Sequence, residues 1–132
     1  MKQDKFLYFR TEATDADDDA TGDSACYPVS SLMGMQPVSD TELQLYFLPM
    51  MRRTPSGNEP DANASFDNHD KVSVTIPANT HLTAITAIVQ AINDYRNDII
   101  VVANDDSGGT KYLANSGITA CGGISVNAAY AN

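Results

Sequence analysis

One segment of the chain, Thr80 to Arg96, has apolar residues at the three- and four-residue spacing of an amphipathic helix. The apolar stripe that this spacing predicts consists of Leu82, Ile85, Ile88, Val89, Ile92 and Tyr95. Asn79 or Thr80 is a suitable N-cap, because a short polar side chain can accept hydrogen bonds from the first backbone N–H groups. The other apolar segments are short and have strand patterns, so we expect this helix to pack on a sheet.

Two segments alternate between apolar and other residues, which predicts strands with one buried face. The residues predicted to point inward are Leu43, Leu45 and Phe47 in Thr41–Leu48, and Val72, Val74 and Ile76 in Lys71–Ile76. Lys5–Arg10 is short and rich in aromatic residues, which also favours a strand. Ile99–Ala103 is continuously apolar and β-branched, which predicts a strand in the middle of a sheet, under the helix and covered on both faces.

The connections between these elements suggest how they are arranged. Strand 71–76, the helix and strand 99–103 follow one another closely and predict a βαβ-like unit, with a right-handed crossover if the strands are parallel. Ala25–Met35 contains Pro28 and Gly34, and it fits an edge strand or an irregular segment.

Asn104–Gly109 is a strong turn signal and introduces a closing antiparallel region, residues 110–114 and 118–126. Gly122 and Gly123 predict a bulge or bend in its last strand. Together these patterns predict one α+β domain over residues 1–132, with a mainly antiparallel or mixed β-sheet and one amphipathic helix packed on it.

Residues 49–70 form a long segment without a helix or strand pattern, 22 residues that include three prolines. Segments of this length in a compact domain are uncommon and often functional, so we interpret it as an irregular arm, with a loop that has no partner as the alternative. The arm begins with Met50, Met51, Arg52 and Arg53. Flexible apolar side chains beside two basic residues suit a protein interface.

The chain has 17 acidic and 8 basic residues, a net charge of −9 and an isoelectric point near 4.3, which disfavours nucleic acid as a partner. Six of the acidic residues lie between Glu12 and Asp23, where there is no basic residue. Without these six, eleven acidic residues face eight basic ones, a net charge of −3. Most of the excess charge therefore belongs to one predicted turn, and the remaining surface is free to pack against protein subunits.

The acidic turn contains part of the residue pattern of a calcium site. Asp15, Asp17 and Asp19 match the first three ligand positions of an EF-hand loop. The sixth position is Ala20 where the loop needs Gly, and the twelfth is Cys26 where it needs a bidentate Glu. We therefore predict a solvated acidic turn without a metal, with weak binding of divalent cations as the alternative.

The sequence has no catalytic motif that we recognise. His69 and His81 lie twelve residues apart without an HExxH pattern, and we expect His81 on the exposed first turn of the helix. No G-x-S-x-G segment presents a nucleophile, and Asp105–Gly109 lacks the lysine and the following helix of a phosphate-binding loop. We therefore expect that the protein is not an enzyme and uses no cofactor.

Cys26 and Cys121 lie far apart and lack CxxC spacing. We expect two small, buried, reduced thiols, and a disulfide between them is the alternative because each lies in a candidate strand. The mean hydropathy of −0.26 and the absence of a long apolar run argue against a membrane-resident chain. The apolar stretch Phe6–Phe9 is too short for the core of a signal peptide.

Several segments carry a family resemblance when they are taken in order. They are KFLYFR with the Asp-rich turn after it, ACYPVSSLMGM, SDTELQLYFLPM, KVSVTI, the helix with TAIVQAIND, IIVVANDDSG, and ITACGGISV near the C-terminus. In this order they resemble a group of small proteins of marine bacteriophages, especially cyanophages, which are regarded as virion components. The resemblance covers most of the chain, implies no active-site residues, and has no clear counterpart of residues 49–70.

The resemblance implies a non-enzymatic virion structural protein that is made in the host cytoplasm, and a capsid decoration or cement protein fits it best. The expected partners are the major capsid protein or other virion subunits, bound by a homo-oligomer or a lattice-bound subunit. The candidate contact residues are Phe6, Tyr8, Met50, Met51, Arg52 and Arg53. The alternatives are a tail, neck or fibre-associated virion protein and, in another class, a small host-directed enzyme or regulator.

Overall fold

The computed structural model describes residues 5–49, 69–94 and 99–128. Most of the predicted arm, residues 50–68, therefore lies outside the described residues. The elements in chain order are β1 (Phe6–Arg10), the short 3-10 helix η1 (Asp15–Asp17), β2 (Ser24–Pro28), the 3-10 helix η2 (Val29–Ser31), β3 (Leu32–Ser39), β4 (Glu42–Phe47), β5 (His69–Thr75), α2 (His81–Asn93), β6 (Ile99–Asn104), β7 (Lys111–Tyr112) and β8 (Ala120–Ala128).

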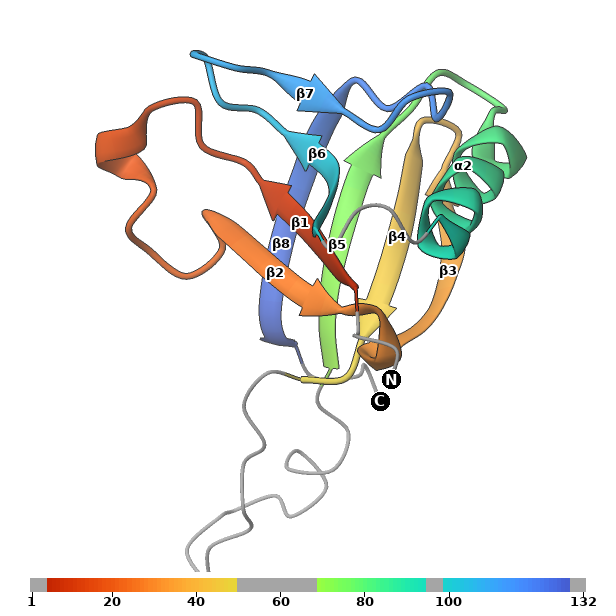
Figure 1. The fold of residues 1–132 in the computed structure, drawn as a ribbon, viewed down its shortest axis with the longest axis horizontal. Coiled ribbons are helices and arrows are strands. Elements are labelled where there is room, and N and C mark those ends of the chain that lie inside the picture. The colour runs from red at the N-terminus through yellow and green to blue at the C-terminus, as the bar shows by residue number, and fades with distance from the viewer. Residues whose placement is uncertain (1–4, 50–68, 95–98, 129–132) are drawn as a thin grey trace, which may run out of the picture.

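The strands form two four-stranded sheets, which we call sheet A and sheet B. Sheet A has the order β2-β1-β6-β7 and is mixed, because β1 is parallel to β6 whereas the other pairs are antiparallel. Sheet B has the order β3-β4-β5-β8 and is antiparallel throughout. Sheet A crosses in front of sheet B in Figure 1, with α2 beside them. The predicted class, a small α+β domain with antiparallel and mixed strands and one helix, is confirmed.

The core lies between the two sheets. The side chains predicted to point inward from β4 and β5 are all buried, and so is Ile76 just after β5. Sheet A contributes Leu7, Phe9, Tyr27, Ile100 and Val102. The ring of Tyr27 stacks on that of Phe47 with centroids 4.2 Å apart, so aromatic packing joins the sheets directly. Each large buried side chain contributes roughly 1.5–3 kcal/mol to the free energy of unfolding.

The predicted βαβ-like unit is wrong, because its two strands belong to different sheets. β5 lies between β4 and β8 in sheet B, whereas β6 lies between β1 and β7 in sheet A. The parallel neighbour of β6 is β1, from the other end of the chain. β6 does lie inside a sheet as predicted, but only one of its faces is fully covered, since Ile99 is 59% exposed. Helix α2 therefore connects the two sheets and contacts both β4 and β6.

Helix α2 is shorter than predicted, and only part of the predicted stripe packs on the core: Ile88 is buried, and Ile85 and Ile92 are partly buried against it. The helix ends at Asn93, and Tyr95 lies outside the described residues. Its buried residues are Ala84, Ala87 and Ile88, whereas Leu82 is 78% exposed and Val89 is 44% exposed. Alanine lets the helix backbone approach the strands closely, so part of the predicted apolar stripe stays in solvent.

Both ends of α2 are fastened to neighbouring strands. His81 lies on the first turn of α2, as predicted, but it is half-buried and not exposed, since its Nε2 lies 2.8 Å from the main-chain oxygen of Ser39. Thr80 is the N-cap residue, but its hydroxyl donates a hydrogen bond to the main-chain oxygen of Pro77. At the other end, Lys5 Nζ donates to the main-chain oxygen of Ile92, where a positive charge stabilises the helix C-terminus.

The edge strands and turns agree in part with the sequence patterns. Residues 25–35 do form parts of two edge strands, β2 and β3. The predicted bulge in β8 is confirmed: Gly123 lies opposite Ser73 and Cys121 opposite Val74, so Gly122 is the extra residue. Residues 105–110 form the predicted turn between β6 and β7, although β7 has only two residues.

Cys26 and Cys121 are both free thiols, as expected, and the alternative disulfide is not formed. Cys121 is buried as predicted, but Cys26 is exposed. The reason is the alternation along β2, which turns Ala25 and Tyr27 toward the core and Cys26 toward the outer face of sheet A.

Candidate functional site: the outer face of sheet A

The outer face of sheet A contains the two described residues that the sequence predicts as contacts, Phe6 and Tyr8. Phe6 is 38% exposed and Tyr8 is half-buried. Both side chains point away from the core, because Leu7 and Phe9, which alternate with them along β1, are fully buried. The other predicted contact residues, Met50, Met51, Arg52 and Arg53, lie outside the described residues.

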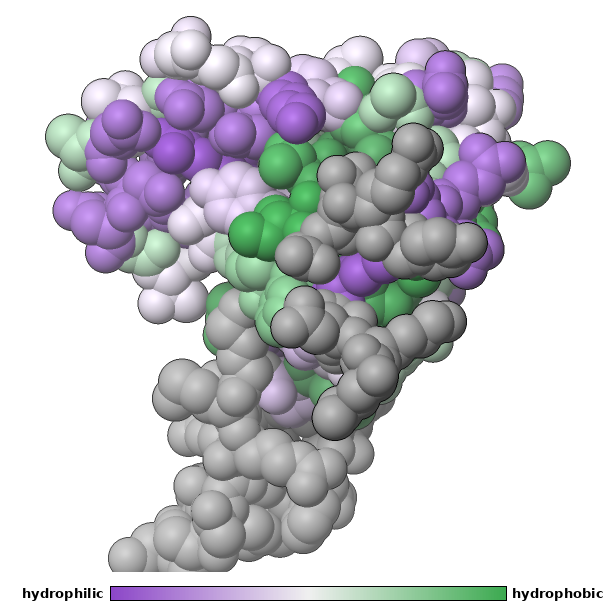
Figure 2. Space-filling view, viewed as in Figure 1, coloured by the Kyte–Doolittle hydropathy of each residue, from purple (hydrophilic) through white to green (hydrophobic). Residues whose placement is uncertain are grey.

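The strand register extends this face across three strands. Phe6 lies between Pro28 of β2 and Ile99 of β6, and Tyr8 lies between Cys26 and Val101. We call these six residues the outer patch: Phe6, Tyr8, Cys26, Pro28, Ile99 and Val101. Figure 2 views this side of the molecule, with apolar residues gathered over β1 and β6 and hydrophilic residues over the acidic turn.

Four of the six residues of the outer patch were not predicted from the sequence. Ile99 and Val101 were expected to be covered on both sides, and Cys26 was expected to be buried. Their exposure depends on the pairing of β6 with β1 and of β1 with β2, which no local pattern contains. The one available signal was the proline at the end of β2, a residue typical of edge strands.

The outer patch carries no ionised side chain at neutral pH. Desolvation by neighbouring groups raises the pKa of the Cys26 thiol above its ordinary value, so the thiol stays protonated although its side chain reaches the surface. The patch is therefore an uncharged surface of aromatic, aliphatic and sulfur-containing side chains. Such a composition is typical of the centre of a protein interface.

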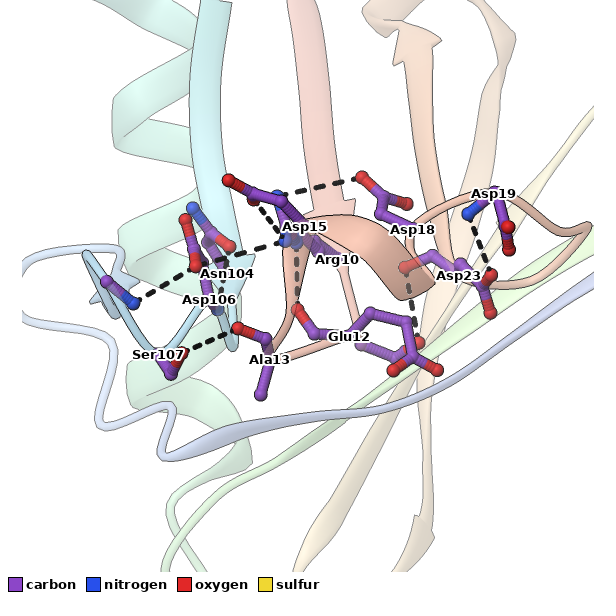
Figure 3. A network of polar contacts seen from close by, with 12 residues as sticks. Arg10, Glu12, Ala13, Asp15, Asp18, Asp19, Asp23, Asn104, Asp106 and Ser107 are labelled. Atoms are coloured by element: carbon purple, nitrogen blue, oxygen red, sulfur yellow. Dashed lines mark hydrogen bonds and ion pairs between the residues drawn. The ribbon is translucent and has the colours of Figure 1, made fainter.

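At one end of β1, a network around Arg10 fixes the acidic turn (Figure 3). Arg10 is only 8% exposed. Its guanidinium donates a hydrogen bond to Asp15 Oδ1 at 2.9 Å and lies 3.6 Å from Asp18 Oδ2 and 3.8 Å from Asp106 Oδ1. The hydrogen bond to Asp15 is the largest of the influences that hold the pKa of Arg10 above its ordinary value, and the other two carboxylates add to it. The guanidinium therefore stays charged and links the turn to the end of β6.

Hydrogen bonds to the backbone complete this link. Asp23 Oδ2 accepts hydrogen bonds from the main-chain N–H groups of Asp19 and Ala20, at 3.2 and 2.7 Å. Ser107 in the β6–β7 turn donates from both its N–H and its hydroxyl to the main-chain oxygen of Ala13. The predicted solvated turn is thus correct for the exposed side chains of Asp15, Asp17 and Asp19, but the turn itself is anchored.

Asp105 joins sheet A to sheet B near this network. Its Oδ1 accepts a hydrogen bond of 2.5 Å from the hydroxyl of Tyr112, and its carboxylate accepts from the main-chain N–H of Cys121. Burial, reinforced by Asp105, raises the pKa of Tyr112 to about 12 and that of Cys121 to about 12. Both groups are protonated at neutral pH, so this contact holds the fold and supplies no reactive anion.

A second carboxylate, that of Asp70, lies fully inside the core. The hydroxyl of Tyr27 donates a hydrogen bond of 2.8 Å to its Oδ2. Burial, and then Asp70 itself, raises the pKa of Tyr27 well above its ordinary value, so the phenol remains a donor. This pair connects β2 of sheet A to β5 of sheet B.

In residues 5–49, 69–94 and 99–128, no group of three or more His, Cys, Asp or Glu side chains is arranged to hold a metal ion. Across the same part of the chain, no helix has both the length and the apolar character needed to cross a membrane.

Comparison with known proteins finds no matching family model, no matching curated protein and no matching solved structure. The class of this protein is therefore defined by its own fold, a small α+β domain with one helix and two sheets. Its candidate functional features are the uncharged outer patch and, at the end of the same sheet, the anchored acidic turn.

Proposed function

We propose that this protein is a non-enzymatic virion structural protein, a capsid decoration or cement protein that bridges neighbouring capsid subunits. Its partner is the major capsid protein, and it binds the shell as an oligomer or as a lattice-bound subunit. The observation that carries the proposal is the outer patch, in which six uncharged residues of three adjacent strands face outward. The sequence resemblance to small virion proteins of marine bacteriophages supports the choice of partner.

The outer patch suits the centre of such a contact. Each apolar side chain that leaves water contributes about 25 cal/mol per Å² of buried surface, and Phe6 and Ile99 are both well exposed. A stable interface covers roughly 800 Å² on each partner, more than six side chains provide. The patch would therefore be the apolar centre, surrounded by polar residues at the rim. Because Arg10 anchors the acidic turn, its negative charge has a fixed position and would steer docking onto a basic surface.

Three surface substitutions test this proposal. Phe6→Asp and Ile99→Asp place a charge in the outer patch, whereas Leu82→Asp places one at a more exposed apolar residue of α2, outside the patch. All three sites are exposed, so the fold tolerates the change. We expect the two patch variants to bind capsid shells at least about ten-fold more weakly in co-sedimentation, and Leu82→Asp to bind like the wild type. Equal binding of all three variants, or no binding of the wild type, contradicts the proposal.

A further inference from the structure

Four polar side chains are joined by hydrogen bonds on the outer face of sheet B. Gln36 Nε2 of β3 donates to the hydroxyl of Tyr46 in β4 at 2.8 Å. That hydroxyl donates to Gln44 Oε1 at 2.8 Å, and Gln44 Nε2 donates to Ser73 Oγ of β5 at 3.0 Å. We call Gln36, Gln44, Tyr46 and Ser73 the polar ladder, which crosses three adjacent strands.

The polar ladder faces away from the core. Along β4 the side chains of Gln44 and Tyr46 alternate with apolar side chains that are fully buried. Gln36 is exposed, and the other three members are half-buried. The core lies between the two sheets, and sheet B lies behind sheet A in Figure 1. The polar ladder and the outer patch are therefore on opposite sides of the molecule.

Glycines leave space on both sides of the polar ladder. Gly34 of β3 lies opposite Tyr46, and Gly123 of β8 lies opposite Ser73. A Cβ at either glycine would meet no atom of the described residues within 4 Å. The flanking strands therefore place no side chain beside these two members, and a ligand can approach them along the sheet surface.

The hydrogen-bonding groups of the polar ladder favour a ligand rich in hydroxyl groups. A glutamine amide has two N–H donors and an oxygen with two acceptor positions, so Gln36 and Gln44 keep donors and acceptors beyond those used within the ladder. Ser73 accepts within the ladder and has its own hydroxyl proton to donate. The hydrogen bonds among the members fix these side chains before a ligand arrives, which lowers the entropy cost of binding.

Charge narrows the class of ligand further. The polar ladder contains no carboxylate, ammonium or guanidinium group, and Lys71 and Glu42 beside it on the same face have opposite charges. The chain has a net charge of −9, which disfavours an anionic ligand. An apolar protein surface would leave the amides without partners. A neutral carbohydrate satisfies both conditions, because its hydroxyl groups donate and accept hydrogen bonds and its C–H groups can pack on an aromatic ring.

We propose that the polar ladder binds a neutral carbohydrate. The two amides and the Ser73 hydroxyl bond to sugar hydroxyl groups, and the ring of Tyr46 packs against a sugar ring. This activity goes beyond the decoration function and does not depend on it. A subunit that contacts a shell through the outer patch would hold the polar ladder on the side turned away from the shell, where a carbohydrate in the surrounding solution can reach it.

Affinity electrophoresis in native gels tests this proposal. The chain, with its net charge of −9, migrates toward the anode, and binding to a polysaccharide held in the gel retards it. The probes are three neutral polysaccharides: dextran, mannan and galactan. Gln36→Ala and Gln44→Ala each remove an amide of the polar ladder, and Gln90→Ala removes the same group from an exposed position of α2 outside it. None of these substitutions changes the charge, and circular dichroism checks that each variant folds.

We expect at least one of the three polysaccharides to retard the wild type. Gln36→Ala and Gln44→Ala should raise the apparent Kd at least about five-fold, as expected for the loss of hydrogen bonds to the ligand, and Gln90→Ala should leave it unchanged. No retardation of the wild type by any of the three, or equal retardation of the wild type and all variants, overturns the carbohydrate proposal.

Co-sedimentation with capsid shells separates this proposal from the decoration function. Gln36→Ala and Gln44→Ala should bind the shells like the wild type, because the polar ladder lies on the side opposite the outer patch. Weaker binding of both variants would assign this face to a protein contact and overturn the carbohydrate proposal. Failure of the wild type to bind shells overturns the decoration function alone, since retardation by a polysaccharide does not depend on it.

Discussion

The hydrogen bond between Tyr27 and Asp70 gives the sharpest prediction about stability. Tyr27→Phe removes only the hydroxyl, so the ring can keep its stacking on Phe47 with centroids 4.2 Å apart. What is lost is a 2.8 Å hydrogen bond to the carboxylate of Asp70, which is completely buried. Hydrogen bonds to buried charged groups contribute about 1.5–3 kcal/mol, so we expect the free energy of unfolding to fall by about 2 kcal/mol.

Urea denaturation followed by circular dichroism measures this loss. With an m-value of about 2 kcal/mol per molar urea, the midpoint should fall by about 1 M. Tyr46→Phe is the matched control, because its hydroxyl donates to Gln44 Oε1 at 2.8 Å but the side chain is only half-buried. The control should change stability by less than about 0.5 kcal/mol. The reasoning is refuted if both variants lose the same stability, since burial of Asp70 would then have no energetic consequence.

Three further predictions concern the turns and the contacts between the sheets. Gly22 has a φ of 95°, and a Cβ there would lie 3.1 Å from the main-chain oxygen of Ile124, so Gly22→Ala should lower the free energy of unfolding in urea by about 1–2 kcal/mol. Gly34→Ala is the control, because a Cβ at Gly34 would meet nothing within 4 Å, and it should cost less. Equal losses in the two variants would contradict this reasoning. Because burial raises the pKa of Cys121 from 9.0 to about 12, the folded state binds its proton more tightly than the unfolded state, and stability should fall as the pH rises from 9 toward 12. In Cys121→Ala that fall should be smaller, because Cys26 is then the one thiol with a raised pKa that contributes to it, and an unchanged fall in thermal melts would argue against this. Arg10→Met should speed amide exchange in residues 11–23 without affecting β5, and equal protection in the variant and the wild type would show that Arg10 does not anchor the turn.

The sequence predicted best those features that depend on local patterns. Alternation in β4 and β5 identified the inward apolar side chains, because a two-residue period determines which face each residue occupies, but it did not predict the buried His69 and Asp70 at the start of β5. The glycine pair in β8 predicted the bulge. The extra residue, Gly122, lies close to Ser73, where a larger residue would be crowded. The fold class followed from these elements.

Features that depend on long-range pairing were not predictable in this way. Short connections suggested that β5 and β6 share a sheet, but β6 pairs with β1, more than ninety positions earlier in the chain. In α2, hydrophobicity favoured Leu82 and Val89, whereas close packing buried Ala84 and Ala87. The spacing of large apolar residues predicts which face of a helix is hydrophobic. It does not predict how closely the helix packs on neighbouring strands, and that distance decides whether small residues such as alanine are the buried ones.

The candidate site contains both residues that were expected from the sequence and residues that only long-range strand pairing brings to it. Phe6 and Tyr8 of the N-terminal strand were expected contact residues of the virion protein that the resemblance implies, and both face outward. Ile99 and Val101 joined them only through the register of two parallel strands. The role of Arg10 was missed because it lies just before the acidic run in the sequence, although a single basic residue next to six acidic ones is a signal of an internal counterion.

The central claim is that this protein decorates a capsid, and quantitative protein mass spectrometry of washed, purified virions tests it most directly. The claim predicts that the chain is present in a copy number comparable with that of the major capsid protein. A few copies per particle would point instead to a tail, neck or fibre position. Presence in infected lysate together with absence from the particles would contradict the virion function altogether and favour a host-directed enzyme or regulator.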